Sequence, residues 1–282
     1  MGIKFIIDSA SDYDIRQAES EGHLFVPLTI IFPDSEYLDA VELSHERFYQ
    51  KLASSPNIPQ TSQVNPQDFK EVFEKATKDG DVAIAILLSS KLSGTYASAV
   101  SAAKDFQEGS VYVIDSLNVT VGLQLLIKYA MSLRDAGKNA PEIVKALEAK
   151  KQHVHTMGLL DTLKYLRKGG RLSATAAFAG GLLNVKPYAK VLDGKVCLAG
   201  KSRGTKQGMA ALKQMVEDTG IDKDLPILFG YTGLDNSTMN KFIELCRPML
   251  DDVQEVLPTI TIGSTIGTHV GPGTIAIGFF SK

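Results

Sequence analysis

The sequence predicts an α/β protein with two domains: an N-terminal α/β domain with a largely parallel sheet, and a C-terminal α+β domain with a mixed or antiparallel sheet. In the first half, short apolar runs alternate with helical patterns, which is typical of βαβ units. In the second half, Asp193-Gly194 separates two strand-like runs and predicts a hairpin. The 282 residues allow two medium domains, which we place at residues 1–158 and 159–282.

The expected strands of the first half are short apolar runs. They span residues 3–7, 24–32, 82–88 and 111–114. The run at 82–88, VAIAILL, is apolar on both faces, as expected of a central strand covered on both sides.

The expected helices have recognisable ends. Asn65 is suited to cap a helix with Pro66 in its first turn and Gly80 after its end. A second helix is predicted over about 122–136, with Gly137 following it.

The second half mixes both patterns. Helices are expected near 161–168, 177–183, 205–218 and 236–250, and strands near 226–231, 253–262 and 274–280. The hairpin and the terminal strands favour a mixed or antiparallel sheet here.

Bulk properties exclude several function classes. The net charge of -2 and a pI near 6.2 argue against a nucleic-acid partner. No apolar stretch is long enough to span a membrane, which leaves only transient membrane contact open, and the N-terminus turns polar too early for a secretion signal. The two cysteines lack metal-ligand spacing and suggest a reducing compartment. We therefore expect a cytoplasmic protein.

The loop in LLSSKLSGTYASA, residues 87–99, is the most informative polar stretch, because it follows a buried strand and precedes a helix. Ser93, Gly94 and Thr95 offer hydroxyls, backbone amides and close approach to a ligand. A serine nucleophile would need an activating base, and the stretch matches neither G-x-S-x-G nor S-x-x-K. A static cradle is the simpler interpretation.

Two further loops carry polar groups at strand or helix ends. Asp8 could accept a phosphoryl group or bind a metal, but capping of the following helix by Asp8 or Ser9 is favoured. Thr61 and Ser62 precede the Asn65 helix, and their local sequence favours a plain polar loop over an anion contact.

The histidines and the basic residues leave alternatives open. His153 and His155 are expected to be partly exposed strand residues and not a metal site, because no third ligand is evident. His269 lies among glycines in an expected loop between two strands, where a structural and a functional role are both open. Arg203, in KSRGTK, fits a solvated loop or a docking point for an acidic partner. Arg171 could organise loops or contact an anion.

Taken together, these blocks resemble the DegV family of bacterial fatty-acid-binding proteins. The matching blocks run in order along nearly the whole chain: IIDSASD (6–12), QTSQVNPQDF (60–69), LSSKLSGTYASA (88–99), VIDSLNVTVG (113–122), LKYLRKGGRLS (163–173), NVKPY (184–188), KSRGTK (201–206) and IGTHVGPG (266–273). Only HTMGLLD, residues 155–161, looks less like the family pattern, and it falls where part of a tunnel wall is expected.

The resemblance implies a carrier that binds one long-chain, palmitate-like fatty acid in an apolar tunnel, without metal, cofactor or catalytic residue. It implies that Thr61 and Ser93 bind the carboxylate. The expected vicinity of the head group comprises Ser62, Gly94, Thr95, Thr268 and His269. Arg203 matches the position that docks a fatty acid kinase related to dihydroxyacetone kinases, which would make an acyl phosphate for phospholipid synthesis.

Two other function classes remain as alternatives at this point. An acyl or phosphoryl transferase, or a hydrolase, would use Ser93 with His269, or Asp8 as a phosphoryl acceptor; the missing nucleophile motif counts against it. A regulatory protein for which the lipid is a signal is the third interpretation.

Overall fold

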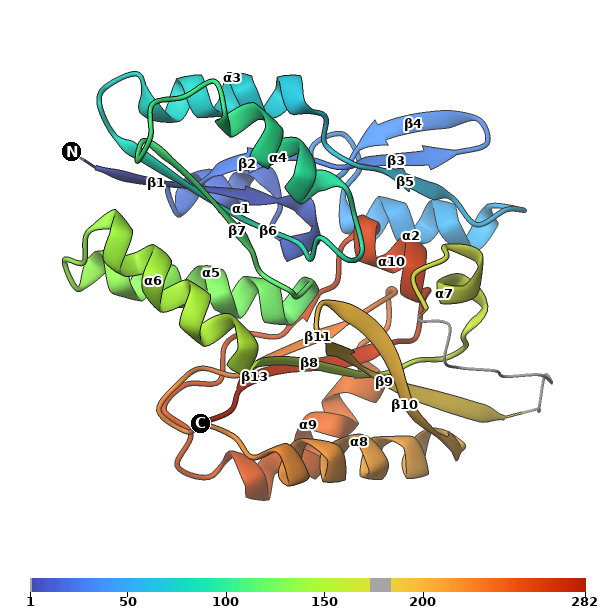
Figure 1. Cartoon of the computed structure of the whole chain (residues 1–282). Helices are drawn as coiled ribbons and strands as arrows, with labels where there is room; N and C mark the ends of the chain where they lie inside the picture. The colour runs from blue at the N-terminus through green and yellow to red at the C-terminus, as the bar shows by residue number, and fades with distance from the viewer. Residues whose placement is uncertain (1, 173–183) are drawn as a thin grey trace.

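The computed structural model describes residues 2–172 and 184–282, so the helix expected at 177–183 lies outside the described residues. Two sheets are stacked with helices on and between them (Figure 1). The helices are α1 (Ile15–Ser20), α2 (His45–Ser54), α3 (Pro66–Thr77), α4 (Thr95–Ala103), α5 (Thr120–Asp135), α6 (Ala140–Lys150), α7 (Lys164–Lys168), α8 (Thr205–Thr219), α9 (Ser237–Leu250) and α10 (Ser264–Val270).

The first sheet is parallel throughout, as predicted. Its strands, in spatial order, are β2 (Leu24–Val26), β1 (Ile3–Asp8), β6 (Val82–Leu87) and β7 (Val111–Asp115). β6 is central and buried, as its two-faced apolar sequence indicates. Helices α3 and α4 cover one face, and α5 and α6 cover the other (Figure 1).

The second sheet is mixed, which confirms the expected class of the C-terminal half. Its strands, in spatial order, are β10 (Lys195–Arg203), β9 (Val185–Leu192), β8 (Val154–Leu159), β13 (Ile275–Phe280), β11 (Leu228–Tyr231) and β12 (Ile260–Thr261). Only β11 and β12 pair in parallel. Helices α8 and α9 cover the outer face. Residue 158, the last of the first expected domain, lies inside β8.

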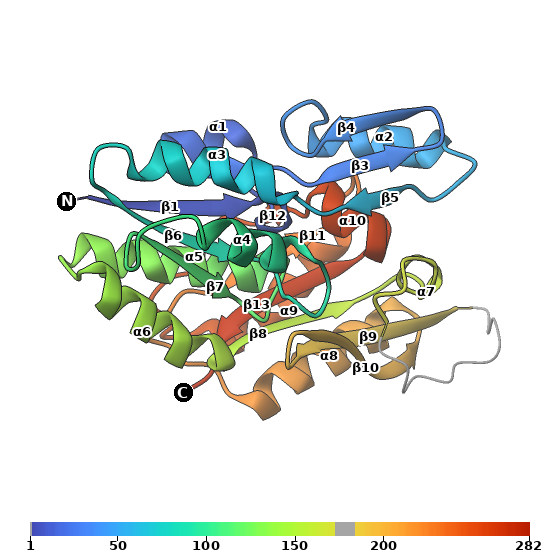
Figure 2. The same ribbon diagram turned by 45° about the horizontal axis from the view of Figure 1, so that its top comes forward.

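A small third sheet was not predicted. β3 (Thr29–Phe32) pairs antiparallel with β4 (Ser35–Leu38) and with β5 (Gln60–Ser62). The single strand expected over 24–32 is therefore wrong: Pro27 lies between β2 and β3, which belong to different sheets. This sheet lies beside α10, at the same end of the molecule as α7 (Figure 2).

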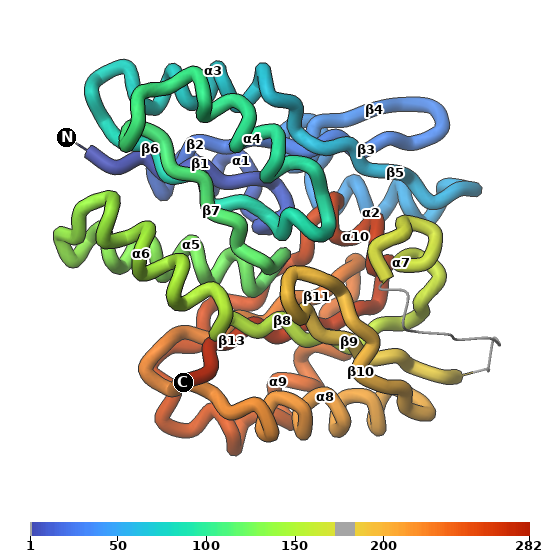
Figure 3. Tube along the Cα trace, in the orientation of Figure 1, coloured from blue at the N-terminus to red at the C-terminus, as the bar shows by residue number. Residues whose placement is uncertain are grey.

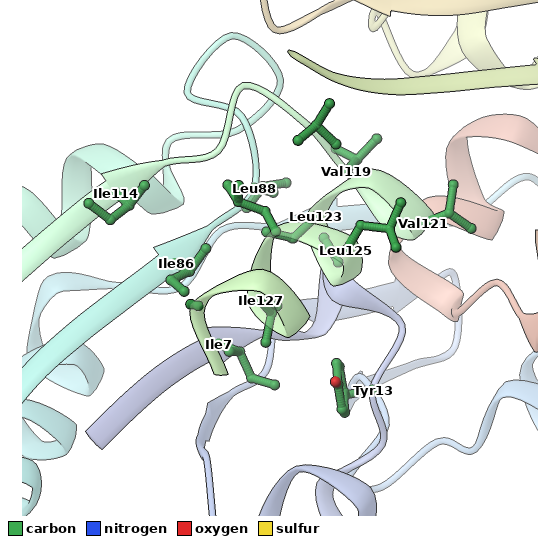
Figure 4. Packing of buried hydrophobic residues seen from close by; sticks show 14 of the residues in the cluster. Ile7, Tyr13, Ile86, Leu88, Ile114, Val119, Val121, Leu123, Leu125 and Ile127 are labelled. Atoms are coloured by element: carbon green, nitrogen blue, oxygen red, sulfur yellow. The ribbon is translucent and has the colours of Figure 1, made fainter. Parts of the chain in front are cut away.

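The largest apolar core joins the two main sheets through α5. In Figure 4, Leu123, Leu125 and Ile127 of α5 lie among side chains such as Ile7 and Ile86 from the parallel sheet. The same helix packs on β8, β11 and β13 of the mixed sheet, and the trace in Figure 3 shows it between the two sheets. Rigid packing here fixes the position of one sheet relative to the other.

Local sequence patterns correctly predicted a helix cap and a hairpin turn. The Asn65 side chain accepts a hydrogen bond from the amide of Asp68, at 3.0 Å. Asp193 and Gly194 both have positive φ, 50° and 78°, which is the backbone of the favoured two-residue hairpin turn. The strand expected over 253–262 is wrong except for its last residues, since only Ile260–Thr261 pairs with β11.

Candidate functional site

A cavity of about 400 Å³ lies at the carboxyl end of β6, beside α10 and the β9–β10 hairpin. Its apolar lining comprises Leu28, Leu88, Leu92, Val119, Leu166, Val196, Ile266 and Val270. The other described lining residues are polar or, in one case, glycine: Thr61, Ser62, Gln63, Ser93, Gly94, Arg171, Thr265 and His269. Sequence segments that are far apart therefore meet in one chamber with an apolar wall and a polar wall.

The polar wall contains a hydrogen-bonded pair from distant elements. Thr61 Oγ1 lies 2.9 Å from His269 Nε2. Thr61 sits on β5, opposite Ile30 of β3, so strand pairing and not a free loop sets its position. The loop expected around His269 is also wrong: the residue lies in α10, which ends before Gly271, where φ is +74°.

His269 is neutral near pH 7. Burial, together with the positive charge of Arg171 as the smaller cause, lowers the pKa of its imidazole to about 4. Among the described residues, Nδ1 of His269 has no hydrogen-bond partner. The imidazole can therefore orient the Thr61 hydroxyl without bringing a charge to the cavity.

Arg171 organises the loops around the cavity. Its Nε donates to the carbonyl of Leu92 at 3.2 Å, and its Nη1 donates to the carbonyl of Gly169 at 2.6 Å. Because the side chain also lines the cavity, it places a positive charge close to the Thr61–His269 pair. The two roles that the sequence left open for Arg171, organising loops and contacting an anion, are therefore compatible.

Ser93 belongs to a hydroxyl pair at the start of α4. Its Oγ lies 3.0 Å from Thr95 Oγ1 and accepts a hydrogen bond from the Thr95 amide at 3.2 Å. Thr95 is buried and does not line the cavity, so it supports Ser93 from the protein interior. Gly94 lies against the end of the exposed Gln63 side chain, which would have to move if a Cβ were added there. No Ser93–His269 hydrogen bond is present in the described part of the chain.

Two neighbouring groups brace this loop. Ser89 Oγ donates to the carbonyl of Gly194 at 2.7 Å, which ties the β9–β10 turn to the Ser93 loop. Asp8 accepts from the amides of Ala10, at 2.9 Å, and Leu88, at 2.7 Å. The favoured capping role of Asp8 is thus confirmed. Burial raises the pKa of Asp8 to about 7.

Two aspartates that sequence reasoning missed position α10. Asp39 accepts from the amide of Thr265 at 3.0 Å and from its hydroxyl at 2.6 Å. Asp12 accepts from the amide of Gly263 at 2.8 Å and from the hydroxyl of Thr120. Both aspartates are buried. Each contacts a residue at the start of α10 that lies more than 200 positions further along the chain, so no local sequence pattern indicates either contact.

A second cavity of about 70 Å³ continues the first. The two share five apolar lining residues: Val119, Leu166, Val196, Ile266 and Val270. Thr156, Gly158 and Leu160, from the segment that departs from the family pattern, also line the second cavity. Thr156 donates its hydroxyl to Asn118 Oδ1 at 2.7 Å, which leaves its methyl group for the cavity.

The remaining expected site residues lie elsewhere. Thr268 is buried in α10 and lines a neighbouring cavity but not the first one. Arg203 is exposed at the end of β10, and its amide donates to Gln207 Oε1 at 3.3 Å. Within residues 2–172 and 184–282, no cluster of three or more metal-ligating side chains occurs, and no helix is both long and apolar enough to cross a membrane.

Comparison with known proteins establishes the family. The model of the DegV family, whose description reads "Uncharacterised protein, DegV family", matches residues 2–282. A DegV domain-containing protein from Caldanaerobacter subterraneus subsp. tengcongensis is 35% identical over 282 residues, covering 99% of each chain. The chain belongs to the DegV family.

Two relatives are described by a ligand. A fatty acid-binding protein from Thermotoga maritima is 30% identical over 284 residues, covering 99% of this chain and 97% of the relative. A solved structure from Thermus thermophilus, described as fatty acid binding of a DegV family protein, has a TM-score of 0.90 and 29% identity, and covers 100% of both chains.

Proposed function

We propose that this protein is a cytoplasmic carrier that binds one long-chain fatty acid. The observation that carries the proposal is the apolar chamber of about 400 Å³ with hydroxyl groups at its polar wall. This volume is within the roughly 300–1,000 Å³ of small-molecule sites. The ligands of the Thermotoga maritima and Thermus thermophilus relatives support the same class of molecule.

The acyl chain, palmitate-like in length, extends from the first cavity into the second. The five shared lining residues make one apolar path of the two cavities. Each buried methylene is worth about 0.8 kcal/mol, so burial of the tail supplies most of the affinity. The head group then needs only to set the orientation of the ligand.

The carboxylate binds the hydroxyls of Thr61 and Ser93. When His269 donates its Nε2 proton to Thr61 Oγ1, the hydrogen of Thr61 is left to donate to a carboxylate oxygen. Hydrogen bonds to a charged acceptor contribute about 1.5–3 kcal/mol each. Ser62, Gly94 and Thr268 lie around this point, while Thr95 holds Ser93 in place.

Catalysis is the task of a partner, a fatty acid kinase of the dihydroxyacetone-kinase type, which docks at Arg203. A carboxylate oxygen forms a bond to the terminal phosphorus of a nucleoside triphosphate, and the bond to the bridging oxygen breaks. The products are an acyl phosphate and a nucleoside diphosphate. A carboxylate held by neutral hydroxyls keeps the electron density that this attack requires. Any contact of the carrier with the membrane is transient.

Lipid extraction and mass spectrometry of the purified protein test the carrier role. We expect one fatty acid per chain, and saturable uptake by delipidated protein. A protein that yields no acyl chain and takes none up would contradict the proposal. Turnover of an acyl or phosphoryl substrate without a kinase, lost in Ser93→Ala, would favour the enzyme interpretation.

Two variants separate binding from docking. Thr61→Ala combined with Ser93→Ala is expected to weaken fatty acid binding, since both carboxylate donors are lost. Arg203→Ala is expected to retain binding and to slow kinase-dependent phosphorylation. Lys241→Ala, an exposed charge on α9, is the control. If Arg203→Ala loses as much fatty acid affinity as the double variant, the docking role is wrong.

A further inference from the structure

Three buried aspartates meet in the protein interior behind the fatty-acid cavity. Asp8 ends β1, Asp12 follows it after one short turn, and Asp39 comes directly after β4. Each of the three is 5% exposed or less. The charge of Asp39 acts on both Asp8 and Asp12, so the three carboxyls lie within electrostatic reach of one another, and we call them the aspartate cluster.

Two members of the aspartate cluster contact the first cavity from behind. Asp8 accepts a hydrogen bond from the amide of Leu88 at 2.7 Å, and Asp39 accepts from the amide and the hydroxyl of Thr265, at 3.0 Å and 2.6 Å. Leu88 and Thr265 both line that cavity. A charge on either carboxyl is therefore one hydrogen bond away from the chamber of the ligand.

The third member joins the cluster to the second cavity and to the start of α10. Asp12 accepts from the hydroxyl of Thr120, which lines the second cavity, and from the amide of Gly263 at 2.8 Å. Along α10, four residues separate Thr265 from His269, which is one helical turn or about 6 Å of axis. The cluster thus lies about one helical turn from the polar wall of the first cavity.

The aspartate cluster has neutral partners. The donors to its carboxyls are amides and hydroxyls, and Oδ1 of Asp39 has no hydrogen-bond partner among the described residues. Burial raises the pKa of both Asp8 and Asp12 to about 7, and the charge of Asp39 acts in the same direction, while their hydrogen bonds oppose the rise. Near neutral pH, a small change of the local field is therefore enough to add or remove a proton here.

We propose that the aspartate cluster takes up a proton when the anion of a fatty acid binds. This inference rests on the proposed function, because it assumes a negative head group at Thr61 and Ser93. That charge repels the carboxylates about one helical turn away, and protonation of one of them relieves the repulsion. Because the loaded carrier then holds more protons than the empty one, the affinity for the anion rises as the pH falls.

The size of the coupling follows from Coulomb's law. Two unit charges on the order of 10 Å apart, at an effective dielectric constant of about 20, shift a pKa by about one unit. A carboxyl that titrates near pH 7 in the empty carrier then titrates near pH 8 in the loaded one. This difference corresponds to about 0.5 proton taken up at pH 7.5, and to an affinity about tenfold weaker at pH 9 than at pH 6.

Other titratable or charged groups face the cluster or the adjoining cavity. They are Tyr13, His45, Tyr49, Tyr231, Arg171 and His269. The pKa of His269 is about 4, so a rise of one unit leaves this imidazole neutral above pH 7. Burial, assisted by the charges of Asp12 and Asp39, raises the pKa of Tyr49 well above its ordinary value, so this hydroxyl keeps its proton. His45, whose Nε2 packs against Gly263, is tested by substitution.

Two ligands of equal chain length test the coupling in the unaltered protein. Tetradecane-1-sulfonate carries a negative charge at every pH used, and 1-tetradecanol carries none, so neither ligand titrates. Isothermal titration at pH 7.5 in two buffers of different ionisation enthalpy counts the protons. We expect uptake of about 0.5 proton with the sulfonate and less than about 0.1 with the alcohol. Only the sulfonate should bind about tenfold more weakly at pH 9 than at pH 6.

Three variants assign the proton to the cluster. Asp12→Asn keeps an oxygen that accepts from Gly263 but removes one titrating carboxyl, so proton uptake with the sulfonate should fall by about half or more. Asp14→Asn is the matched control: it makes the same change two residues later, at an exposed helix cap, and leaves the uptake unchanged. His45→Gln should also leave the uptake unchanged.

The outcomes separate the coupling from the carrier function. The coupling is overturned by sulfonate binding without proton uptake, by equal uptake with the alcohol, by full uptake in Asp12→Asn, or by its loss in His45→Gln. Each of these results leaves ligand binding itself intact. If the unaltered protein binds neither the sulfonate nor myristate, the carrier function is wrong and the coupling is wrong with it.

Discussion

Three small side chains at the far end of the apolar path should set the length of the fatty acid. Ala276 on β13 pairs with Gly158 on β8, and Gly158 pairs with Ala189 on β9. All three line the second cavity, whose volume is only about 70 Å³. Any added methyl group in this row takes space from the end of the acyl chain.

Ala276→Val is the sharpest perturbation of this row. Valine suits a strand, and its two extra methyl groups project into the second cavity. If they displace two methylenes of the ligand, the loss is about 1.6 kcal/mol, or roughly fifteenfold in Kd. We expect that loss for stearate, a smaller one for palmitate, and almost none for myristate.

Isothermal titration with the three acids measures the effect. Ile277→Val is the matched control: it alters the next residue of β13, which faces the core under α8 and α9 and not the cavity. Ile277→Val should lower the free energy of unfolding by about 1 kcal/mol without changing the order of the affinities for the three acids. If Ala276→Val weakens all three acids equally, the tail does not end at this row.

Three other predictions concern the head group, a buried carboxyl and a helix cap. Thr61→Val should weaken palmitate by about 10–100-fold but hexadecanol by less than about threefold, because only the acid has a charged acceptor; equal losses in a displacement assay would refute this. Burial raises the pKa of Asp12 to about 7, so its proton stabilises the fold fully below about pH 4 and this stabilisation is lost as the pH rises through 7. The free energy of unfolding of Asp12→Asn should therefore rise relative to that of the unaltered protein between about pH 4 and 7. A difference that stays constant over this range in urea denaturation would contradict the prediction. Asn65→Ala should lower the free energy of unfolding by about 1 kcal/mol in the same assay, and an unchanged denaturation midpoint would rule out the cap.

Features that depend on near neighbours could be read from the sequence. The cap at Asn65 needs only the amide of Asp68, and the turn at Asp193-Gly194 needs only two residues that tolerate positive φ. The central position of β6 follows from its composition, because a strand that is apolar on both faces must be covered on both. Each of these signals lies within one element, so no knowledge of the rest of the chain is required.

Features that depend on distant partners could not be read in this way. The local sequence around Thr61 favours a plain loop, yet pairing with β3 makes the segment a strand. The run over 24–32 looks like one strand, but its two ends pair with different sheets. The partner of Thr61, Ile30, lies about 30 positions away in the chain, and the two halves of the run over 24–32 pair in two different sheets. Hydrophobic periodicity encodes neither of these pairings.

The candidate site also depends on contacts between residues far apart in the chain, which explains why local sequence patterns could not decide the roles of its residues. Thr61 and His269 are 208 residues apart, and their contact requires α10 to be a helix held against the small sheet. Asp39 provides that hold through Thr265, although nothing in its own sequence context marks it as part of a site. A family resemblance can identify such residues because it compares whole chains, and the structure then supplies the physical reason. Of the two hydroxyls that the resemblance assigns to the ligand, strand pairing places Thr61 and the hydroxyl of Thr95 supports Ser93, and both residues line the same chamber.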